Sequence, residues 1–149
     1  MLGAVRALLQ RVSEASVTVG GVEIGRIGRG LCALVGVAGD DEHPAAVRLA
    51  AKIWQLRLFP DADGNMNRSA AELGLDVLVV SQFTLYADTT RGRRPSFARA
   101  AGPEQARELV DEVINQLKGY GAAVATGRFG ATMQVHLVND GPVTVMLET

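Results

Sequence analysis

The chain has 149 residues, of which 48% are apolar, and a formal net charge of −1. This length suits one domain over residues 1–149 with a single core, and the apolar content argues against a disordered chain. No apolar run reaches the 18 residues of a membrane span and none forms a signal-peptide core, so we expect a cytoplasmic protein with no membrane partner.

The near-neutral charge argues against a protein that coats nucleic acids in general. One segment differs, because residues 89–100 contain four arginines and no acidic residue. They are Arg91, Arg93, Arg94 and Arg99. Charge alone leaves two interpretations open, a solvated loop or a local contact with phosphates. An enzyme that holds only the tip of an RNA would have this charge pattern.

The first third of the chain predicts strands. Residues 5–12 are β-compatible, and residues 16–19 and 22–27 alternate in polarity around Gly20-Gly21, which is typical of a β-hairpin. Residues 31–37 are almost entirely apolar, as in a strand that is covered on both faces.

Two helices are predicted, far apart in the sequence. The first starts near Pro44 and ends near Leu56, and the second runs from about Pro103 to Lys118, with Gly119 just past its end. Further short strands are expected at 56–59, 77–80, 124–127, 134–138 and 143–147. Because strands and helices do not alternate, we expect a compact α+β domain of curved, mostly antiparallel or mixed, barrel-like sheets with two main helices.

Several kinds of catalytic site have no support in the sequence. Cys32 is the only cysteine, and His43 and His136 are the only histidines, so neither a metal cluster nor a histidine-activated nucleophile is indicated. Residues 61–65 resemble a calcium loop, but their glycine is at position four instead of six, so a turn is expected. Glycine-rich phosphate loops are missing. We therefore expect no metal and no cofactor.

Two polar motifs remain. Ser81-Gln82-Phe83-Thr84 follows an apolar strand and offers hydroxyls, an amide and a stacking face, although an ordinary strand-to-turn transition would explain the same residues. The residue types of Asn139-Asp140-Gly141-Pro142 are typical of a turn. A cis Gly141-Pro142 peptide would point two carbonyl oxygens the same way, but a plain turn with a trans peptide is favoured because only about one X-Pro bond in twenty is cis.

These motifs and others in the same order resemble the bacterial D-aminoacyl-tRNA deacylases, over nearly the whole chain. The matching segments are Gln10-Arg11-Val12, Ala15-Ser16-Val17-Thr18-Val19, Ile27-Gly28-Arg29-Gly30-Leu31, Ser81-Gln82-Phe83-Thr84-Leu85, Arg94-Pro95-Ser96-Phe97, Thr126-Gly127-Arg128-Phe129, Met133-Gln134-Val135 and Asn139-Asp140-Gly141-Pro142-Val143-Thr144. The resemblance implies a homodimer that hydrolyses the ester between a D-amino acid and the 3′-terminal adenosine of tRNA, and that also removes glycine mischarged on tRNA-Ala.

The resemblance also implies residue roles. Ser81-Gln82-Phe83-Thr84 matches the catalytic segment around the adenosine and the scissile ester. Gly141-Pro142 matches a cis element that reaches the partner subunit's active site at the subunit interface and rejects L side chains. Arg11 matches the arginine that braces this element, and Phe129 and Met133 match pocket-side positions.

For the chemistry, we expect backbone N–H groups near Gln82 and Phe83 to stabilise the oxyanion and a water oriented by the ribose 2′-OH to attack. Thr84 has been regarded in the family as a nucleophile, but no base that would activate it is evident. The expected contacts with tRNA phosphates are Arg91, Arg93 and Arg94.

Two alternatives remain open. One is the related editing domain of threonyl-tRNA synthetases, which is usually fused to a synthetase and lacks the paired motifs. The other is a non-catalytic nucleic-acid-binding module, which the near-neutral charge and the lack of a long basic stripe disfavour. One departure from the family is the segment Met1-Leu2-Gly3-Ala4 ahead of Val5-Arg6, where the family usually begins.

Overall fold

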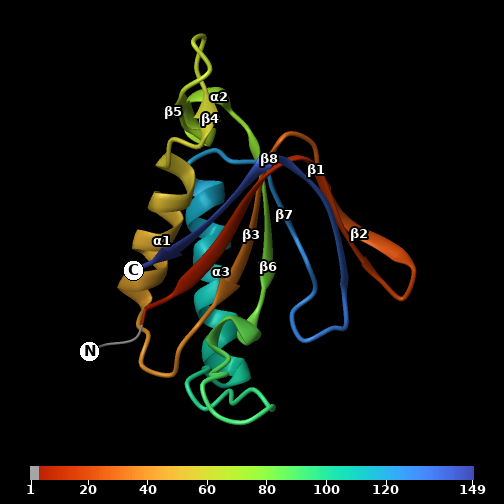
Figure 1. The fold of residues 1–149 in the computed structure, drawn as a ribbon, viewed down its shortest axis with the longest axis vertical. Helices are drawn as coiled ribbons and strands as arrows, with labels where there is room; N and C mark the ends of the chain where they lie inside the picture. The colour runs from red at the N-terminus through yellow and green to blue at the C-terminus, as the bar shows by residue number, and fades with distance from the viewer. Residues whose placement is uncertain (1–3) are drawn as a thin grey trace.

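The computed structural model describes residues 4–149, so most of the Met1-Leu2-Gly3-Ala4 segment lies outside the described residues. The main sheet has the order β2-β1-β3-β6-β7, and β8 pairs with the other edge of β1 (Figure 1). The strands are β1 (Arg6–Val19), β2 (Val22–Ile27), β3 (Gly30–Gly36), β4 (Phe59–Pro60), β5 (Met66–Arg68), β6 (Asp76–Ser81), β7 (Val124–Thr126) and β8 (Gln134–Glu148). The helices are α1 (His43–Gln55), α2 (Ala70–Leu73), the 3₁₀ turn η1 (Phe83–Tyr86) and α3 (Pro103–Gly119).

Both faces of the sheet centre are covered, which explains why β3 is apolar throughout. Leu31 and Val35 of β3 face a core that includes Ile53 of α1 and Val113 of α3. On the other face, Cys32 joins a second cluster with residues of β6 and of the curled second half of β1. The mixed, strongly curved sheet with two main helices confirms the expected α+β class.

The long strands correct two predictions. Residues 5–12 and 16–19 were expected to be separate strands, but β1 is one 14-residue strand with a hairpin to β2 at Gly20-Gly21. Residues 134–138 and 143–147 were also expected to be separate, with a turn between them, but both belong to β8.

The predicted turn at Asn139-Asp140-Gly141-Pro142 is a bulge within β8. Val12 of β1 pairs with Asn139 and Gln10 pairs with Thr144, so four residues of β8 lie opposite Arg11 alone. The sequence signal for an irregular backbone was correct, but the antiparallel ladder resumes beyond it. A local turn signal cannot show this, because the pairing that continues the strand is made with β1.

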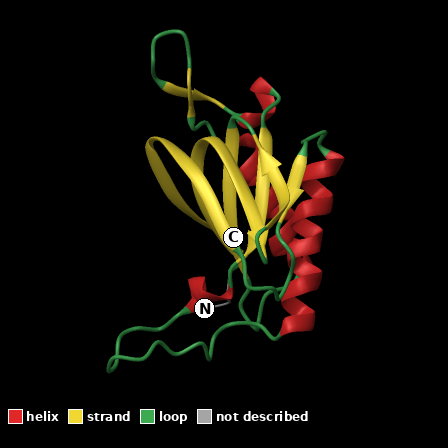
Figure 2. Cartoon of the chain, turned by 90° about the vertical axis from the view of Figure 1, so that its right-hand side faces the viewer, coloured by secondary structure: helices red, strands yellow, loops and turns green. Residues whose placement is uncertain are grey.

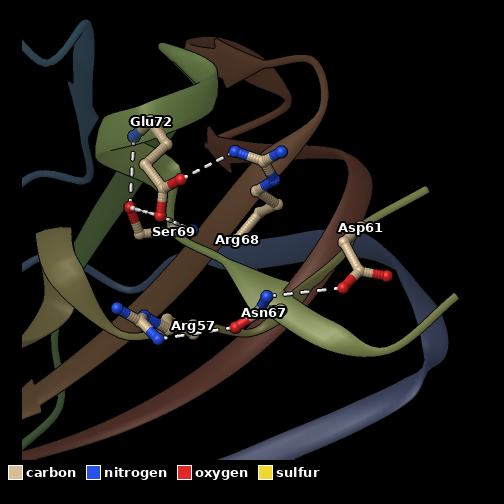
Figure 3. A network of polar contacts seen from close by, with 6 residues as sticks. All are labelled: Arg57, Asp61, Asn67, Arg68, Ser69 and Glu72. Carbon is tan, nitrogen blue, oxygen red and sulfur yellow. Dashed lines mark hydrogen bonds and ion pairs between the residues drawn. The ribbon is translucent and has the colours of Figure 1, made fainter. Parts of the chain in front are cut away.

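The segment between α1 and β6 contains a protruding hairpin, β4–β5 (Figure 2). Its loop is a turn, as expected: an Asp61 carboxylate oxygen accepts the N–H groups of Asp63 and Asn65. The next element, α2, was not predicted. Ser69 and Glu72 cap it reciprocally, and Arg68 pairs with Glu72 at 3.0 Å (Figure 3).

The two main helices lie close to their predicted bounds, although α3 includes Gly119 as its last residue instead of ending before it. Among residues 4–149, no helix is long and apolar enough to cross a membrane.

Candidate active site

The polar residues at the end of β6 are fixed by the sheet. Ser81 is the last residue of β6 and pairs with Val35 of β3, and the Gln82 N–H donates to the Val35 carbonyl oxygen at 2.8 Å. The chain then leaves the sheet and forms η1, which begins with Phe83 and Thr84. The apolar strand therefore delivers this segment to the edge of the sheet, beyond the packed core.

A groove of about 620 Å³ opens beside this segment. Its walls come from the end of β6 and the start of η1, the start of α3, and the loop between β7 and β8. The lining residues are Val80, Ser81, Gln82, Phe83, Phe97, Ala100, Ala101, Pro103, Ala106, Phe129, Gly130, Ala131, Met133 and Val135. The structure thus brings Ser81, Gln82 and Phe83 together with Phe129 and Met133, while Thr84 lies outside this lining.

Aromatic rings form part of the groove wall. Phe83 is 54% exposed, and its ring meets the Phe97 ring edge-on, with centroids 5.1 Å apart. Such rings offer stacking faces for a nucleobase. Phe97 was not named as a site residue from the sequence, although an aromatic residue in an otherwise polar and basic segment is a signal that would have found it.

The groove wall contains no side chain that could act as an acid, a base or a metal ligand by ionisation. None of its lining residues is ionisable. The Thr84 hydroxyl accepts a hydrogen bond from the Gln82 side-chain amide, not from a base. Among residues 4–149, no group of three or more His, Cys, Asp or Glu residues is arranged to hold a metal.

Backbone donors are available next to the groove. The N–H groups of Phe83 and Thr84, the first two of η1, make no hydrogen bond within the described part of the chain. Of the N–H groups expected near Gln82 and Phe83, that of Gln82 itself is not free, because it is donated to Val35. The Phe83 and Thr84 N–H groups are therefore free to bind an oxyanion beside the groove.

The basic segment forms a loop beside the groove, between η1 and α3 (Figure 2). Asp88 and Ser96 close the loop with two backbone hydrogen bonds of 2.7 and 2.8 Å. The Asp88 carboxylate accepts the N–H and the hydroxyl of Thr90, and these bonds hold the pKa of that carboxyl below its usual value. The side chains of Arg91, Arg93 and Arg94 are exposed, whereas Arg99 packs its guanidinium over the Tyr86 ring. We call residues 89–95 the arginine loop.

The Gly141-Pro142 segment is held on both sides. Its peptide bond is cis, and Gly141 has φ 142°, a conformation that favours glycine. Arg11 donates from Nε to the Asp140 carbonyl oxygen at 2.9 Å and from Nη1 to the Leu58 carbonyl oxygen at 2.7 Å. Asn139 accepts the Val143 N–H through its side-chain oxygen at 2.9 Å.

The bulge and the groove lie at opposite ends of the sheet. Arg11 pairs with Leu31, which pairs with Val77 near the start of β6, whereas Ser81 ends β6. Four residues of strand span about 13 Å, and β8 and β6 are also three strand spacings apart. Figure 1 shows the bend of β8 at the top of the sheet and η1 below its lower end. One copy of the chain therefore does not bring Gly141-Pro142 to its own groove.

Comparison with known proteins agrees with the resemblance found in the sequence. The family model described as D-Tyr-tRNA(Tyr) deacylase matches residues 8–148. A D-aminoacyl-tRNA deacylase of Roseiflexus castenholzii is 58% identical over 97% of this chain and 92% of its own length, and one of Heliobacterium modesticaldum is 54% identical over 96% and 95%.

Solved structures agree as well. A c-Myc DNA unwinding element binding protein is 42% identical, with a TM-score of 0.91 over 97% of this chain and 98% of that one. A probable eukaryotic D-amino acid tRNA deacylase shares the fold, with a TM-score of 0.84 at 19% identity over 98% of this chain and 100% of its own. The family match and the identities above confirm the assignment made from the motifs: the chain belongs to the D-Tyr-tRNA(Tyr) deacylase family.

Proposed function

We propose that this protein hydrolyses the ester bond of D-aminoacyl-tRNA, releasing the free D-amino acid and the tRNA, and so removes D-amino acids before translation uses them. The observation that carries the proposal is a groove with aromatic walls and free backbone donors but no ionisable lining residue, beside the arginine loop. An aminoacyl ester is already an activated acyl group, so it needs a stabilised oxyanion more than a strong base. The relatives named D-aminoacyl-tRNA deacylase support the same substrate class.

In the proposed reaction, water attacks the ester carbonyl carbon, assisted by the ribose 2′-OH. The N–H groups of Phe83 and Thr84 stabilise the oxyanion, a contribution of about 3–4 kcal/mol per donor in other enzymes. The bond to the ribose 3′ oxygen then breaks, and that oxygen takes the proton that the water has lost. The arginine loop contacts the phosphates of the acceptor end, and the aromatic wall stacks on the terminal adenosine.

In this mechanism Thr84 is not the nucleophile. Its hydroxyl accepts from Gln82 and has no basic partner, so Thr84→Ala should lower kcat by less than about tenfold. Single-turnover release of D-tyrosine from D-Tyr-tRNA measures this. A Thr84→Ala protein that folds and binds substrate normally but has lost all turnover would overturn the water mechanism.

Chirality is proposed to be read by Gly141-Pro142 of a second copy. This element and the groove are too far apart to meet within one chain, and both residues are exposed. In a homodimer with the active site at the interface, the backbone of the bulge would occupy the space of an L side chain. Glycine has no side chain, so glycyl-tRNA-Ala would also be cleaved.

The test is the release of amino acid from D-Tyr-tRNA, L-Tyr-tRNA and glycyl-tRNA-Ala. Release from the first and third, but not from the second, is expected. A similar structure bears the name of a DNA-binding protein, and a non-catalytic nucleic-acid-binding module would instead release nothing from any of the three. Cleavage of L-Tyr-tRNA at the same rate as D-Tyr-tRNA would refute the chiral role.

A further inference from the structure

Tyr86, the last residue of η1, is a buried ring at the centre of a charged cluster whose arginines, Arg6 and Arg99, are partly buried and exposed, respectively. Its side chain is 2% exposed. The Arg6 guanidinium carbon lies 4.4 Å from the ring centroid, and that of Arg99 lies 5.3 Å from it. Both distances are within the range of cation–π attraction, which is strongest where water is excluded. One ring therefore attracts cations from two distant segments, the first residue of β1 and the end of the loop before α3.

Arg6 holds η1 by its backbone as well as by this ring. Its Nη1 donates to the Leu85 carbonyl oxygen at 3.1 Å, and its Nε lies 2.8 Å from a carboxylate oxygen of Glu148 at the end of β8. The sheet edge is a rigid support, because β1 is paired on both sides at Arg6, to Gly36 and to Glu148. Arg6 thus ties the end of η1 to the most strongly paired strand of the fold.

Arg99 ties the other side of the cluster to the loop that carries Phe97. The Arg99 carbonyl oxygen accepts the Gly39 N–H at 3.0 Å. Asp41, which is 5% exposed, accepts the Ala38 N–H at 2.6 Å, and burial raises the pKa of its carboxyl. The segment that joins β3 to α1 therefore contributes to the cluster through the Gly39 N–H, which binds Arg99, and through the carboxylate of Asp41, which lies near Tyr86.

The hydroxyl of Tyr86 contributes little to this arrangement. Its oxygen has no hydrogen-bond partner among residues 4–149. Burial, followed by the nearby Asp41 carboxylate, raises the pKa of Tyr86 to about 12, so the phenol is neutral at physiological pH. The aromatic ring, and not the hydroxyl, accounts for the contacts with the two arginines.

The turn η1 depends on this anchor. It has only four residues, and a single 3₁₀ turn has little stability of its own. Phe83 and Thr84 at its start are exposed, whereas Tyr86 at its end is buried. The bond from the Gln82 N–H to Val35 holds the chain just before η1, and Tyr86 holds its end, so the direction of the Phe83 and Thr84 N–H groups depends on both.

We propose that Tyr86, held by Arg6 and Arg99, is a positioning residue for the deacylation reaction. Through η1 it fixes the direction of the Phe83 and Thr84 N–H groups, and through Arg99 it joins them to the segment that follows the arginine loop. This inference rests on the proposed function, since it assigns Tyr86 a part in stabilising the oxyanion without touching the substrate.

The test compares four variants by single-turnover and steady-state cleavage of D-Tyr-tRNA. Tyr86→Phe keeps the ring and should retain the parental kcat, whereas Tyr86→Leu and Arg6→Met should each lower kcat by about tenfold, because small misplacements of catalytic groups have large effects on rate. KM should change less than kcat, since β6, α3 and the loop between β7 and β8 supply most of the groove wall and do not depend on η1. Arg6→Met combined with Tyr86→Leu should lose no more than the larger single effect, because the two side chains act as one unit.

Leu117→Ala is the matched control for stability. Leu117 is fully buried in α3, near the end of the helix away from the groove, so its truncation should lower the unfolding midpoint but not kcat. The Leu85 and Ala87 amides donate to the Gln82 and Thr84 carbonyl oxygens, so their hydrogen exchange reports the integrity of η1. Faster exchange of these two amides in Tyr86→Leu, but not in Tyr86→Phe or Leu117→Ala, would support positioning directly.

Each outcome has a distinct meaning. A parental protein that releases no D-tyrosine would refute the proposed function and the positioning role with it. An active parental protein whose Tyr86→Leu variant keeps its kcat, or loses no more than Leu117→Ala, would refute only the positioning role. Losses that multiply in the double variant would show that Arg6 and Tyr86 act separately, which also overturns the inference.

Discussion

Replacing Arg11 with methionine would remove the side chain that holds the β8 bulge. The Arg11 side chain is 12% exposed and makes two charge-assisted hydrogen bonds, a partly buried one to the Leu58 carbonyl oxygen and an exposed one to that of Asp140. We expect about 2–4 kcal/mol of lost stability, because the partly buried bond contributes about 1.5–3 kcal/mol and the exposed one less. For a chain of this size the melting temperature should fall by about 5–10 °C.

The effect on activity should differ between the two chiral substrates. The side chain of Asn139 still bonds Val143 and Thr144, so the bulge should persist but move. Cleavage of L-Tyr-tRNA should therefore rise relative to D-Tyr-tRNA in a single-turnover assay. Arg26→Met is the matched control, because Arg26 makes an exposed ion pair with Glu23, and losing such a pair should lower stability far less than losing the Arg11 contacts. An Arg11→Met protein that is destabilised but discriminates D from L as before would refute the bracing role.

Three further predictions concern binding and stability. Arg93→Ala combined with Arg94→Ala should weaken tRNA binding and reduce the slope of log Kd against log salt by about 1.4–1.8, and an unchanged slope would rule out a phosphate contact. A β-carbon at Gly30 would overlap a backbone oxygen at the start of β6, so Gly30→Ala should cost several kcal/mol in chemical denaturation, whereas Gly28→Ala, with no atom within 4 Å of its β-carbon, should be far milder. The pKa of Tyr86 is raised from 10.0 to about 12, so between these pH values the phenol ionises in the unfolded chain but not in the folded protein. The free energy of unfolding of the parental protein should therefore fall by about 2–3 kcal/mol as the pH rises from 10 to 12, and Tyr86→Phe should lack this fall.

The sequence was a good guide where local pattern and burial agree. The apolar run at residues 31–37 predicted a strand covered on both faces, and β3 has helices on one side and the curled sheet on the other. The apolar stripe after Pro44 predicted α1 to within one residue at each end. In both segments the side chains that specify the element are the same side chains that pack it.

The predictions failed where the conformation of a segment depends on hydrogen bonds or contacts with residues that are distant in sequence. Asn139-Asp140-Gly141-Pro142 has the composition of a turn, but pairing with β1 on both sides makes it a bulge in β8. Donors to the oxyanion were expected among the N–H groups near Gln82 and Phe83, but the sequence could not show that the Gln82 N–H is donated to Val35, 47 positions away. Tyr86 was not singled out, because its environment is made by Arg6, 80 positions earlier, and by Arg99, and no local pattern shows that these arginines meet its ring.

The candidate site is hard to predict from side-chain identities because its selective groups are backbone groups. The proposed oxyanion donors are the N–H groups of Phe83 and Thr84, and the proposed chiral gate is the backbone around Gly141-Pro142. The side chains alone left both segments open to ordinary turn interpretations, and only the resemblance to a family gave them roles. Side chains instead support these backbone groups without contacting the substrate: Arg11 holds the bulge and Tyr86 anchors η1. A substitution at these supporting positions should therefore change selectivity or rate without altering any group that meets the substrate, which is why the Arg11 and Tyr86 variants are more informative than substitutions in the groove itself.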